Sequence, residues 1–118
     1  IPILSLDKIR SLLEEIKEVV LSDVVSDYLL NLVHASREHP DVELGISPRG
    51  LLALMRAAQA KAFIENRKYI RPDDIKSLVP YVFPHRLILT MEGTIKKTPE
   101  EVVEEIIHNV PVPVEEGS

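Results

Sequence analysis

A short segment, GISPRG at residues 45–50, places an arginine where the first turn of a helix is predicted. The hydroxyl of Ser47 can accept a hydrogen bond from an unpaired backbone N–H, and Pro48 suits the first helical position. Because this end of a helix carries partial positive charge, an exposed cation there is disfavoured by about 0.3–1 kcal/mol. The free N–H groups attract anions, however, so Arg49 becomes favourable once a phosphate binds beside it. The segment therefore predicts phosphate binding.

Arg56 follows Arg49 by two helical turns, so the two side chains are expected on roughly one face of the same helix. A phosphate ligand could use both guanidinium groups. The alternative is that Arg56 forms an ordinary surface salt bridge, and the residues alone leave both interpretations open. For Arg49 the salt-bridge interpretation is weaker, because the helix start already favours an anion at that place.

Other signatures of catalysis are absent from the sequence. It contains no GxxxxGK[ST] phosphate loop and no GxGxxG motif. The four histidines lack metal-ligand spacing and the chain has no cysteine, so we expect no metal site. Acidic pairs such as Glu104 and Glu105 are typical of solvated helix faces. The chain by itself is not expected to build a nucleotide-binding cradle.

Apolar residues at helical spacing predict an all-α fold, a small bundle of about five helices. Ser5, Ser22 and Thr98 can each cap a helix start in the same way as Ser47. Pro72 followed by two aspartates predicts a further start, because carboxylates suit the first turn. The predicted helices begin at Ser5, Ser22, Ser47, Pro72 and Thr98, and they end near Val20, His39, Asn66, Pro84 and Val110.

At most a minor two-stranded β ribbon is predicted, near residues 69–70 and 87–95. Tyr69 and Ile70 are a short β-prone pair, and HRLILTMEGTIKK is typical of a strand, a turn at Glu92 and Gly93, and a returning strand. The segment DVELGI is predicted as a loop. Residues 1–4 are expected to form an extended linker into a single domain, and residues 110–118 a flexible tail.

Length and charge limit the class of protein. The 118 residues are the size of one domain, and the net charge of −5 argues against a general nucleic-acid-binding protein, which needs a basic surface. No stretch is apolar and long enough to span a bilayer, and none resembles a signal peptide. We therefore expect a cytoplasmic location. The chain begins at Ile1 without a methionine, which favours a piece of a longer protein.

Residues 36–89 closely resemble the C-terminal lid domain of MoxR-type AAA+ ATPases. Three separated motifs carry the resemblance and occur in the family's order: GxSPR, RxYxxPDDI and HRLIL. The resemblance implies that Arg49 is the sensor-2 arginine, a catalytic residue that reaches toward the nucleotide phosphates. It also implies that Ser47, Pro48 and Arg56 belong to the nucleotide-binding set.

Three positions depart from the usual pattern of that family. Ile46 and Gly50 stand where alanine is usual, and Asn66 stands where glycine is usual. Gly50 lowers helix propensity near the start by about 0.5–1 kcal/mol, but it is expected to leave room for a ligand beside Arg49. None of the three changes removes the arginine, the proline or the cap.

For the whole protein, the resemblance implies a hexameric, chaperone-like ATPase. ATP with Mg²⁺ would be bound mainly by a core domain outside this chain, so we expect no activity from the fragment and ATP hydrolysis by its parent. The expected partners are that core, the other subunits of the ring, and client proteins that include von Willebrand A-type proteins. Two alternatives stay open, the lid of a magnesium-chelatase subunit and a free-standing histone-like module. The acidic balance opposes the histone-like module.

Overall fold

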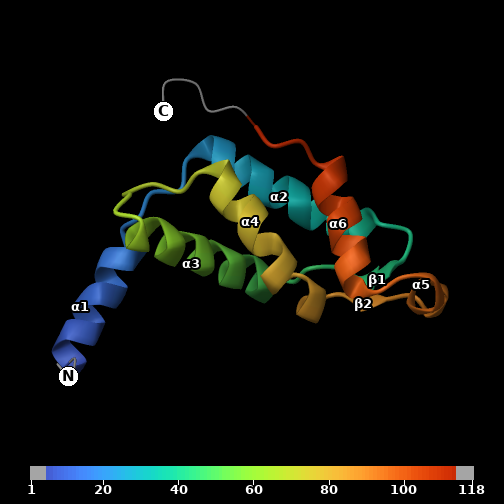
Figure 1. The fold of residues 1–118 in the computed structure, drawn as a ribbon, viewed down its shortest axis with the longest axis horizontal. Helices are drawn as coiled ribbons and strands as arrows, with labels where there is room; N and C mark the ends of the chain where they lie inside the picture. Colours follow the sequence, from blue (N-terminus) through green and yellow to red (C-terminus); the bar gives the residue numbers. More distant parts are fainter. Residues whose placement is uncertain (1–4, 114–118) are drawn as a thin grey trace.

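The computed structural model describes residues 5–113, which form six α-helices, one 3₁₀ helix and a two-stranded ribbon (Figure 1). The α-helices are α1 (Leu6–Lys17), α2 (Asp23–Glu38), α3 (Pro48–Ile64), α4 (Pro72–Val82), α5 (Met91–Lys96) and α6 (Pro99–Asn109). The remaining elements are β1 (Val42–Leu44), β2 (Ile88–Leu89) and the 3₁₀ helix η1 (Pro84–Arg86). The predicted all-α bundle with a minor ribbon is confirmed. The predicted linker at 1–4 and the tail residues 114–118 lie outside the described residues.

The five predicted helix starts are confirmed, and hydroxyl caps explain four of them, at Ser5, Ser22, Ser47 and Thr98. In each of these four cases the hydroxyl of the cap residue accepts a hydrogen bond from the backbone N–H of the residue three positions later. These hydrogen bonds measure 3.1, 3.3, 3.2 and 3.2 Å at Ser5, Ser22, Ser47 and Thr98. In α6 the Glu101 carboxylate also accepts the Thr98 N–H at 3.1 Å, which completes a capping box.

The ribbon and the helix count differ from the prediction. β1 comes from the DVELGI segment, predicted as a loop, and pairs antiparallel with β2. Tyr69 instead forms an isolated parallel bridge with Val20. The segment predicted as a turn and returning strand is helix α5, because the Thr90 hydroxyl accepts the Gly93 N–H at 2.9 Å. A Cβ on Gly93 would lie 2.7 Å from the carbonyl oxygen of Asp41, so only glycine permits this approach.

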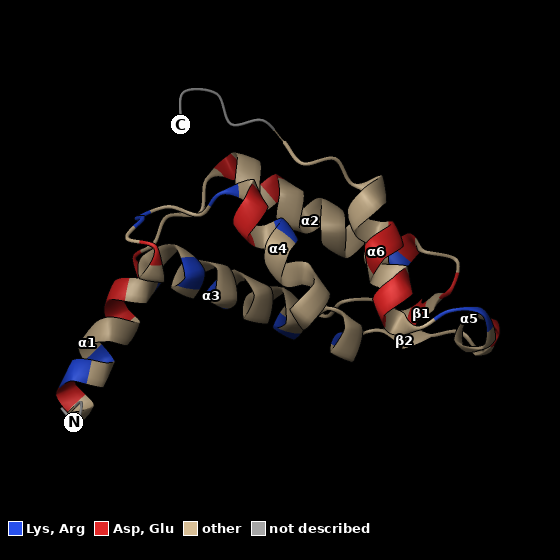
Figure 2. Cartoon of the chain, viewed as in Figure 1, with Lys and Arg blue, Asp and Glu red and all other residues tan. Residues whose placement is uncertain are grey.

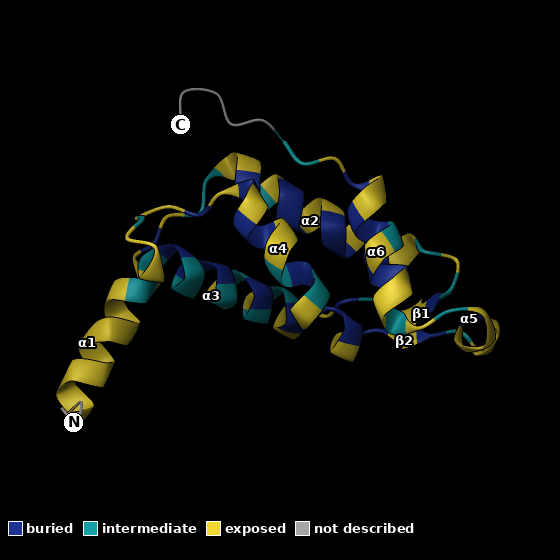
Figure 3. Cartoon of the chain, in the orientation of Figure 1, coloured by how far each residue is buried: buried dark blue, intermediate teal, exposed yellow. Residues whose placement is uncertain are grey.

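The core lies between α2, α3, α4 and α6 (Figures 1 and 3). Its largest fully buried side chains are Tyr28, Phe83, Leu32, Ile46, Leu54, Ile70, Ile75 and Ile106. On α3 the buried residues include Gly50, Leu54, Ala58 and Ala62, which recur every four residues. Leu52 lies outside this stripe and is exposed. Small side chains on the buried stripe allow α4 to approach the α3 backbone closely.

Helix α1 projects away from the bundle, and none of its residues is buried (Figure 3). Its larger apolar side chains Leu6, Ile9, Leu12 and Leu13 are all exposed. The predicted helix is thus confirmed, but no part of residues 5–113 covers these apolar side chains. Neither α1 nor any other described helix is long and apolar enough to cross a membrane.

A buried ion pair fixes the end of α3 against the start of α4. The Asp74 carboxylate accepts hydrogen bonds from Arg67 Nη1 at 2.6 Å, Arg67 Nη2 at 2.8 Å and Lys61 Nζ at 2.9 Å. Burial by itself raises the pKa of the Asp74 carboxyl, but these donors and the Arg71 N–H lower it to about 2. Between the two helices Asn66 has a φ of 61°, in the left-handed region that glycine adopts most easily.

A second polar cluster ties the loop after α2 to α6. The Lys97 ammonium lies 3.0 Å from the Asp41 carboxylate and 2.7 Å from that of Glu105. The imidazole of His39 contacts Glu105 through Nε2 at 2.9 Å and accepts the Asp41 N–H through Nδ1 at 3.1 Å. The contacts from Lys97 lower the carboxyl pKa of both Asp41 and Glu105. This cluster holds the chain as it leaves α2 toward the GISPRG segment.

Candidate functional site

The residues that precede α3 are held by α2. The buried Ser36 hydroxyl accepts the Ile46 N–H at 3.1 Å and donates to the Val33 carbonyl at 2.6 Å. The Arg37 guanidinium donates to the Ile46 carbonyl through Nη2 at 3.1 Å and Nε at 3.3 Å. Both backbone polar groups of Ile46 are therefore satisfied by α2, and this fixes the place and direction in which α3 begins.

Arg49 lies in the first turn of α3, as predicted, with its side chain exposed. The Ser47 hydroxyl occupies the Gly50 N–H, and Pro48 precedes Arg49 at the first helical position. Within residues 5–113 the Arg49 guanidinium forms no hydrogen bond and no ion pair. The more enclosed cations behave differently, because Lys61, Arg67 and Lys97 all pair with carboxylates. Arg49 is thus not used to hold these elements together.

Arg56 lies two turns further along α3 and is also exposed, but it has a partner. Its Nη1 donates to Oε1 of Gln59 at 3.1 Å. Gln59 is buried and donates in turn to the Val19 carbonyl at 3.1 Å and the Lys17 carbonyl at 3.4 Å. The structure therefore places Ser47, Pro48 and Arg49 together at the helix start, and it links Arg56 to the carbonyls of Lys17 and Val19 only through Gln59.

Two arginines near the start of α3, Arg37 and Arg86, were not identified as site residues from the sequence. Each lies against a glycine of the GISPRG segment: a Cβ on Gly45 would meet Arg37 Cγ at 2.6 Å, and a Cβ on Gly50 would meet Arg86 Cδ at 3.1 Å. The expectation that Gly50 leaves room for a ligand is therefore wrong, because the stem of Arg86 and the side chain of Ile46 fill that space. The HRLIL motif alone gave no sign that Arg86 lies beside α3.

The chemistry of Arg49 and Arg86 at the start of α3 fits the binding of a phosphate group. Arg49 and Arg86 are exposed guanidinium groups, and no carboxylate in the described range pairs with either. Guanidinium binds phosphate through paired N–H donors, and a helix start adds favourable dipole and N–H groups. The described residues contain no group of three or more histidines or acids that could hold a metal ion. The arrangement can bind and orient a phosphate.

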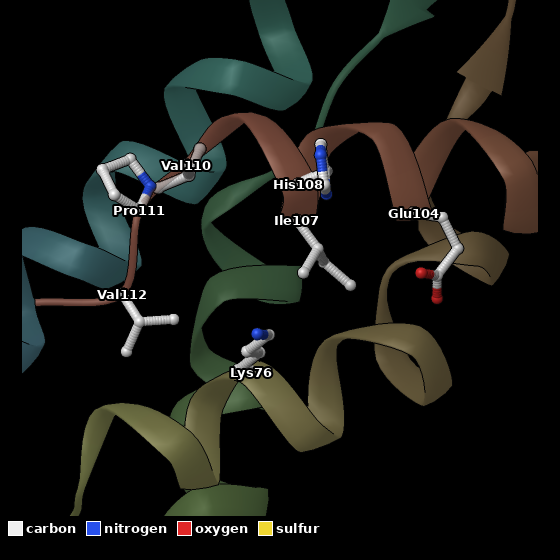
Figure 4. A pocket seen from close by; sticks show the side chains of 7 residues that line it. All are labelled: Lys76, Glu104, Ile107, His108, Val110, Pro111 and Val112. Carbon is white, nitrogen blue, oxygen red and sulfur yellow. The ribbon is translucent and has the colours of Figure 1, made fainter.

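A separate hollow lies between α4 and α6 and has a volume of about 290 Å³ (Figure 4). It is lined by Lys76, Glu104, Ile107, His108, Val110, Pro111 and Val112. None of the four predicted site residues lines it. The hollow includes Val110 and Val112, the first residues of the predicted tail, of which Val110 is buried against the core.

The AAA lid domain family matches residues 34–106. The matched range extends from the second half of α2 into α6, so it contains the GISPRG segment, the Arg67–Asp74 pair and Arg86. It exceeds half of the chain and omits α1.

This chain is similar to several known proteins. YeaC of Bacillus subtilis strain 168, described as uncharacterized, is 39% identical over an alignment of 118 positions that covers 99% of this chain and 37% of YeaC. The chaperone MoxR1 of Mycobacterium tuberculosis is 31% identical over 97 residues, covering 74% of this chain and 26% of MoxR1. A crystal structure from Cytophaga hutchinsonii, described as a candidate ATPase, superposes with a TM-score of 0.84 at 29% identity, covering 92% of this chain and 36% of that one. The chain therefore spans well under half the length of these proteins.

Proposed function

The chain belongs to the AAA lid domain family, and from this premise we propose that it is the C-terminal lid of a MoxR-type ATPase and contacts the nucleotide through Arg49. In this proposal residues 1–118 form one lid domain of a longer protein. The remaining length of that protein carries the core that binds ATP with Mg²⁺. The whole protein hydrolyses ATP in the cytoplasm.

The observation that supports a role for Arg49 is its exposed guanidinium, unpaired within the described residues, at a helix start that α2 holds in place. A charged group on a fixed support can stabilise a developing negative charge without reorganising. When the lid closes, Arg49 places positive charge at the phosphates and the domain excludes water from them. Arg49 loses this contact after hydrolysis, which frees the lid to move.

The other predicted site residues have supporting roles in this proposal. Ser47 caps the helix and Pro48 begins it, so both determine where the Arg49 backbone lies. Arg56 is on the same helix, and its Nη1 already donates to Gln59. We assign it an auxiliary contact on the nucleotide side, which uses the donors that Gln59 leaves unoccupied.

The partners in this proposal are those of a ring-forming remodelling protein. The lid contacts the core of its own chain and the ring is hexameric. Lid movement then couples hydrolysis to the remodelling of client protein complexes, among them von Willebrand A-type proteins. MoxR1, which is named a chaperone, supports this direction.

The proposal predicts different nucleotide binding by the fragment and by the whole protein. One arginine cluster without a cradle leaves most of the nucleotide without contacts, so calorimetric titration of the isolated chain with ATP and Mg²⁺ should give no micromolar binding. The full-length protein should bind and hydrolyse ATP, and Arg49→Ala should lower that hydrolysis roughly a hundredfold. Micromolar affinity of the isolated chain for ATP would contradict the proposal that the core binds most of the nucleotide and the lid only contacts its phosphates.

A further inference from the structure

Arg86 lies against the helix start that carries Arg49, although 37 positions separate the two residues in the sequence. Cδ of Arg86 is 3.1 Å, and its Cβ 3.9 Å, from where a Cβ of Gly50 would lie. The Arg86 stem therefore crosses the first turn of α3 at the residue next to Arg49. Figure 2 shows the colour of Lys and Arg both at the start of α3 and in η1, the elements that contain Arg49 and Arg86.

The backbone on both sides of Arg86 is anchored while its side chain is exposed. Phe83 is completely buried, and its carbonyl accepts the Arg86 N–H at 2.9 Å. Pro84 and Leu87 are buried as well. Since η1 is fixed by these neighbours, the position of the Arg86 stem is set by the core, and only its charged end is presented to solvent.

The positive charges near the start of α3 lack acidic partners, although the chain as a whole is acidic. Arg49 and Arg86 have no carboxylate partner in residues 5–113, and Arg37 uses its guanidinium on a neutral carbonyl. The Arg86 stem lies against Gly50, the residue next to Arg49, so two positive charges share this part of the surface and repel each other, and no carboxylate of the described region forms an ion pair with either. A ligand with several adjacent negative charges would offset this repulsion.

We propose that Arg86 is a second phosphate-contacting residue of the lid and binds the polyphosphate of the nucleotide beside Arg49. The inference rests on the proposed function, because it assigns Arg86 to the same nucleotide. It adds a specificity: two guanidinium groups from α3 and η1 favour a chain of phosphates over a single anion. Gly50 contributes by allowing the Arg86 stem to lie close to α3.

The experiment uses the full-length protein and the variants Arg86→Gln, Arg49→Ala and Arg71→Gln. Glutamine keeps the stem through Cδ, so the cover over Gly50 remains while the charge is removed. Arg71 is a matched control, since it is exposed and its guanidinium has no carboxylate partner in the described residues and lies over the Tyr69 ring, away from the start of α3. The readouts are the Kd of a fluorescent ATP analogue, the dependence of that Kd on salt, and the melting temperature of each isolated lid variant.

Arg86→Gln should weaken binding of the ATP analogue about tenfold or more and reduce its salt dependence, with an unchanged melting temperature of the isolated lid. Arg71→Gln should change neither the Kd of the ATP analogue nor the salt dependence of that Kd. Unchanged affinity in Arg86→Gln with weakened affinity in Arg49→Ala would overturn this inference and leave the proposed function standing. Unchanged affinity in both would overturn both. A lower melting temperature with unchanged affinity would show that Arg86 serves only the fold.

Discussion

At the scale of single residues, arginine is used in two ways that the sequence does not distinguish. Arg67 and Arg49 both belong to motifs of the same family, yet Arg67 is largely enclosed and pairs with Asp74, whereas Arg49 is exposed and unpaired within the described residues. Burial decides the difference, because an enclosed charge needs a partner and an exposed one does not. The cap at Ser47 was the one local signal that marked Arg49.

The lowered pKa of Asp74 predicts a specific loss of stability in acid. Its carboxyl pKa is about 2 in the folded chain, against an ordinary value of 3.8. The folded state therefore gains about 2 kcal/mol from the ionised group above pH 4, and this gain disappears as the pH falls from about 4 to 2. Urea unfolding of the isolated chain and of Asp74→Asn at several pH values measures it.

The Asn variant serves as the reference for that titration, because Asp41, Glu65 and Glu105 also have lowered pKa values and add to the acid sensitivity of both proteins. The difference in unfolding free energy between the two proteins should be largest near pH 7 and shrink toward pH 2. A difference that stays constant over this range would show that the Asp74 carboxylate contributes nothing through its charge.

Tyr28 offers a second residue-level test. The residue is 1% exposed, and its hydroxyl has no hydrogen-bond partner in the described structure. Burying a polar group without a partner costs free energy, so Tyr28→Phe should leave the unfolding free energy unchanged or raise it by about 1 kcal/mol. Thermal and urea unfolding measure the change. A clear loss of stability in this variant would mean that the hydroxyl has a partner.

At the scale of elements, four local caps could be predicted, the cap at Thr90 was missed because its segment is β-prone, and long-range pairing could not be predicted. Ser5, Ser22, Ser47 and Thr98 act within three residues, and each starts a helix as predicted. The ribbon joins Val42–Leu44 to Ile88–Leu89, which are distant in sequence and carry no mutual signal. The role of Arg86 could not be predicted for the same reason, because its position beside Gly50 is a result of tertiary packing between segments distant in sequence.

Helix α1 should be the least protected helix of the isolated chain. None of its 12 residues is buried, and a helix of about this length is only marginally stable without tertiary contacts. Hydrogen–deuterium exchange followed by mass spectrometry should show rapid exchange in α1 and slow exchange in α2, which carries six buried residues. Protection of α1 equal to that of α2 would contradict this expectation.

At the scale of the whole molecule, the core and the candidate site depend on different interactions. α2, α3, α4 and α6 are joined by the apolar core and by the Asp74 and Lys97 ion pairs. The site lies where the chain enters α3, with η1 packed beside it, and none of those ion pairs includes Arg49. A change at Arg49 should therefore separate the fold of the domain from the activity of the longer protein.

The most direct test of the account compares the melting temperature of the isolated domain with the ATP turnover of the full-length protein, both measured for Arg49→Ala. Removing an exposed cation from the positive end of α3 should leave the melting temperature unchanged or slightly raised. The same change should lower turnover roughly a hundredfold. A clear fall in melting temperature together with near-normal turnover would contradict the account, because it would show that Arg49 serves the fold and not the nucleotide.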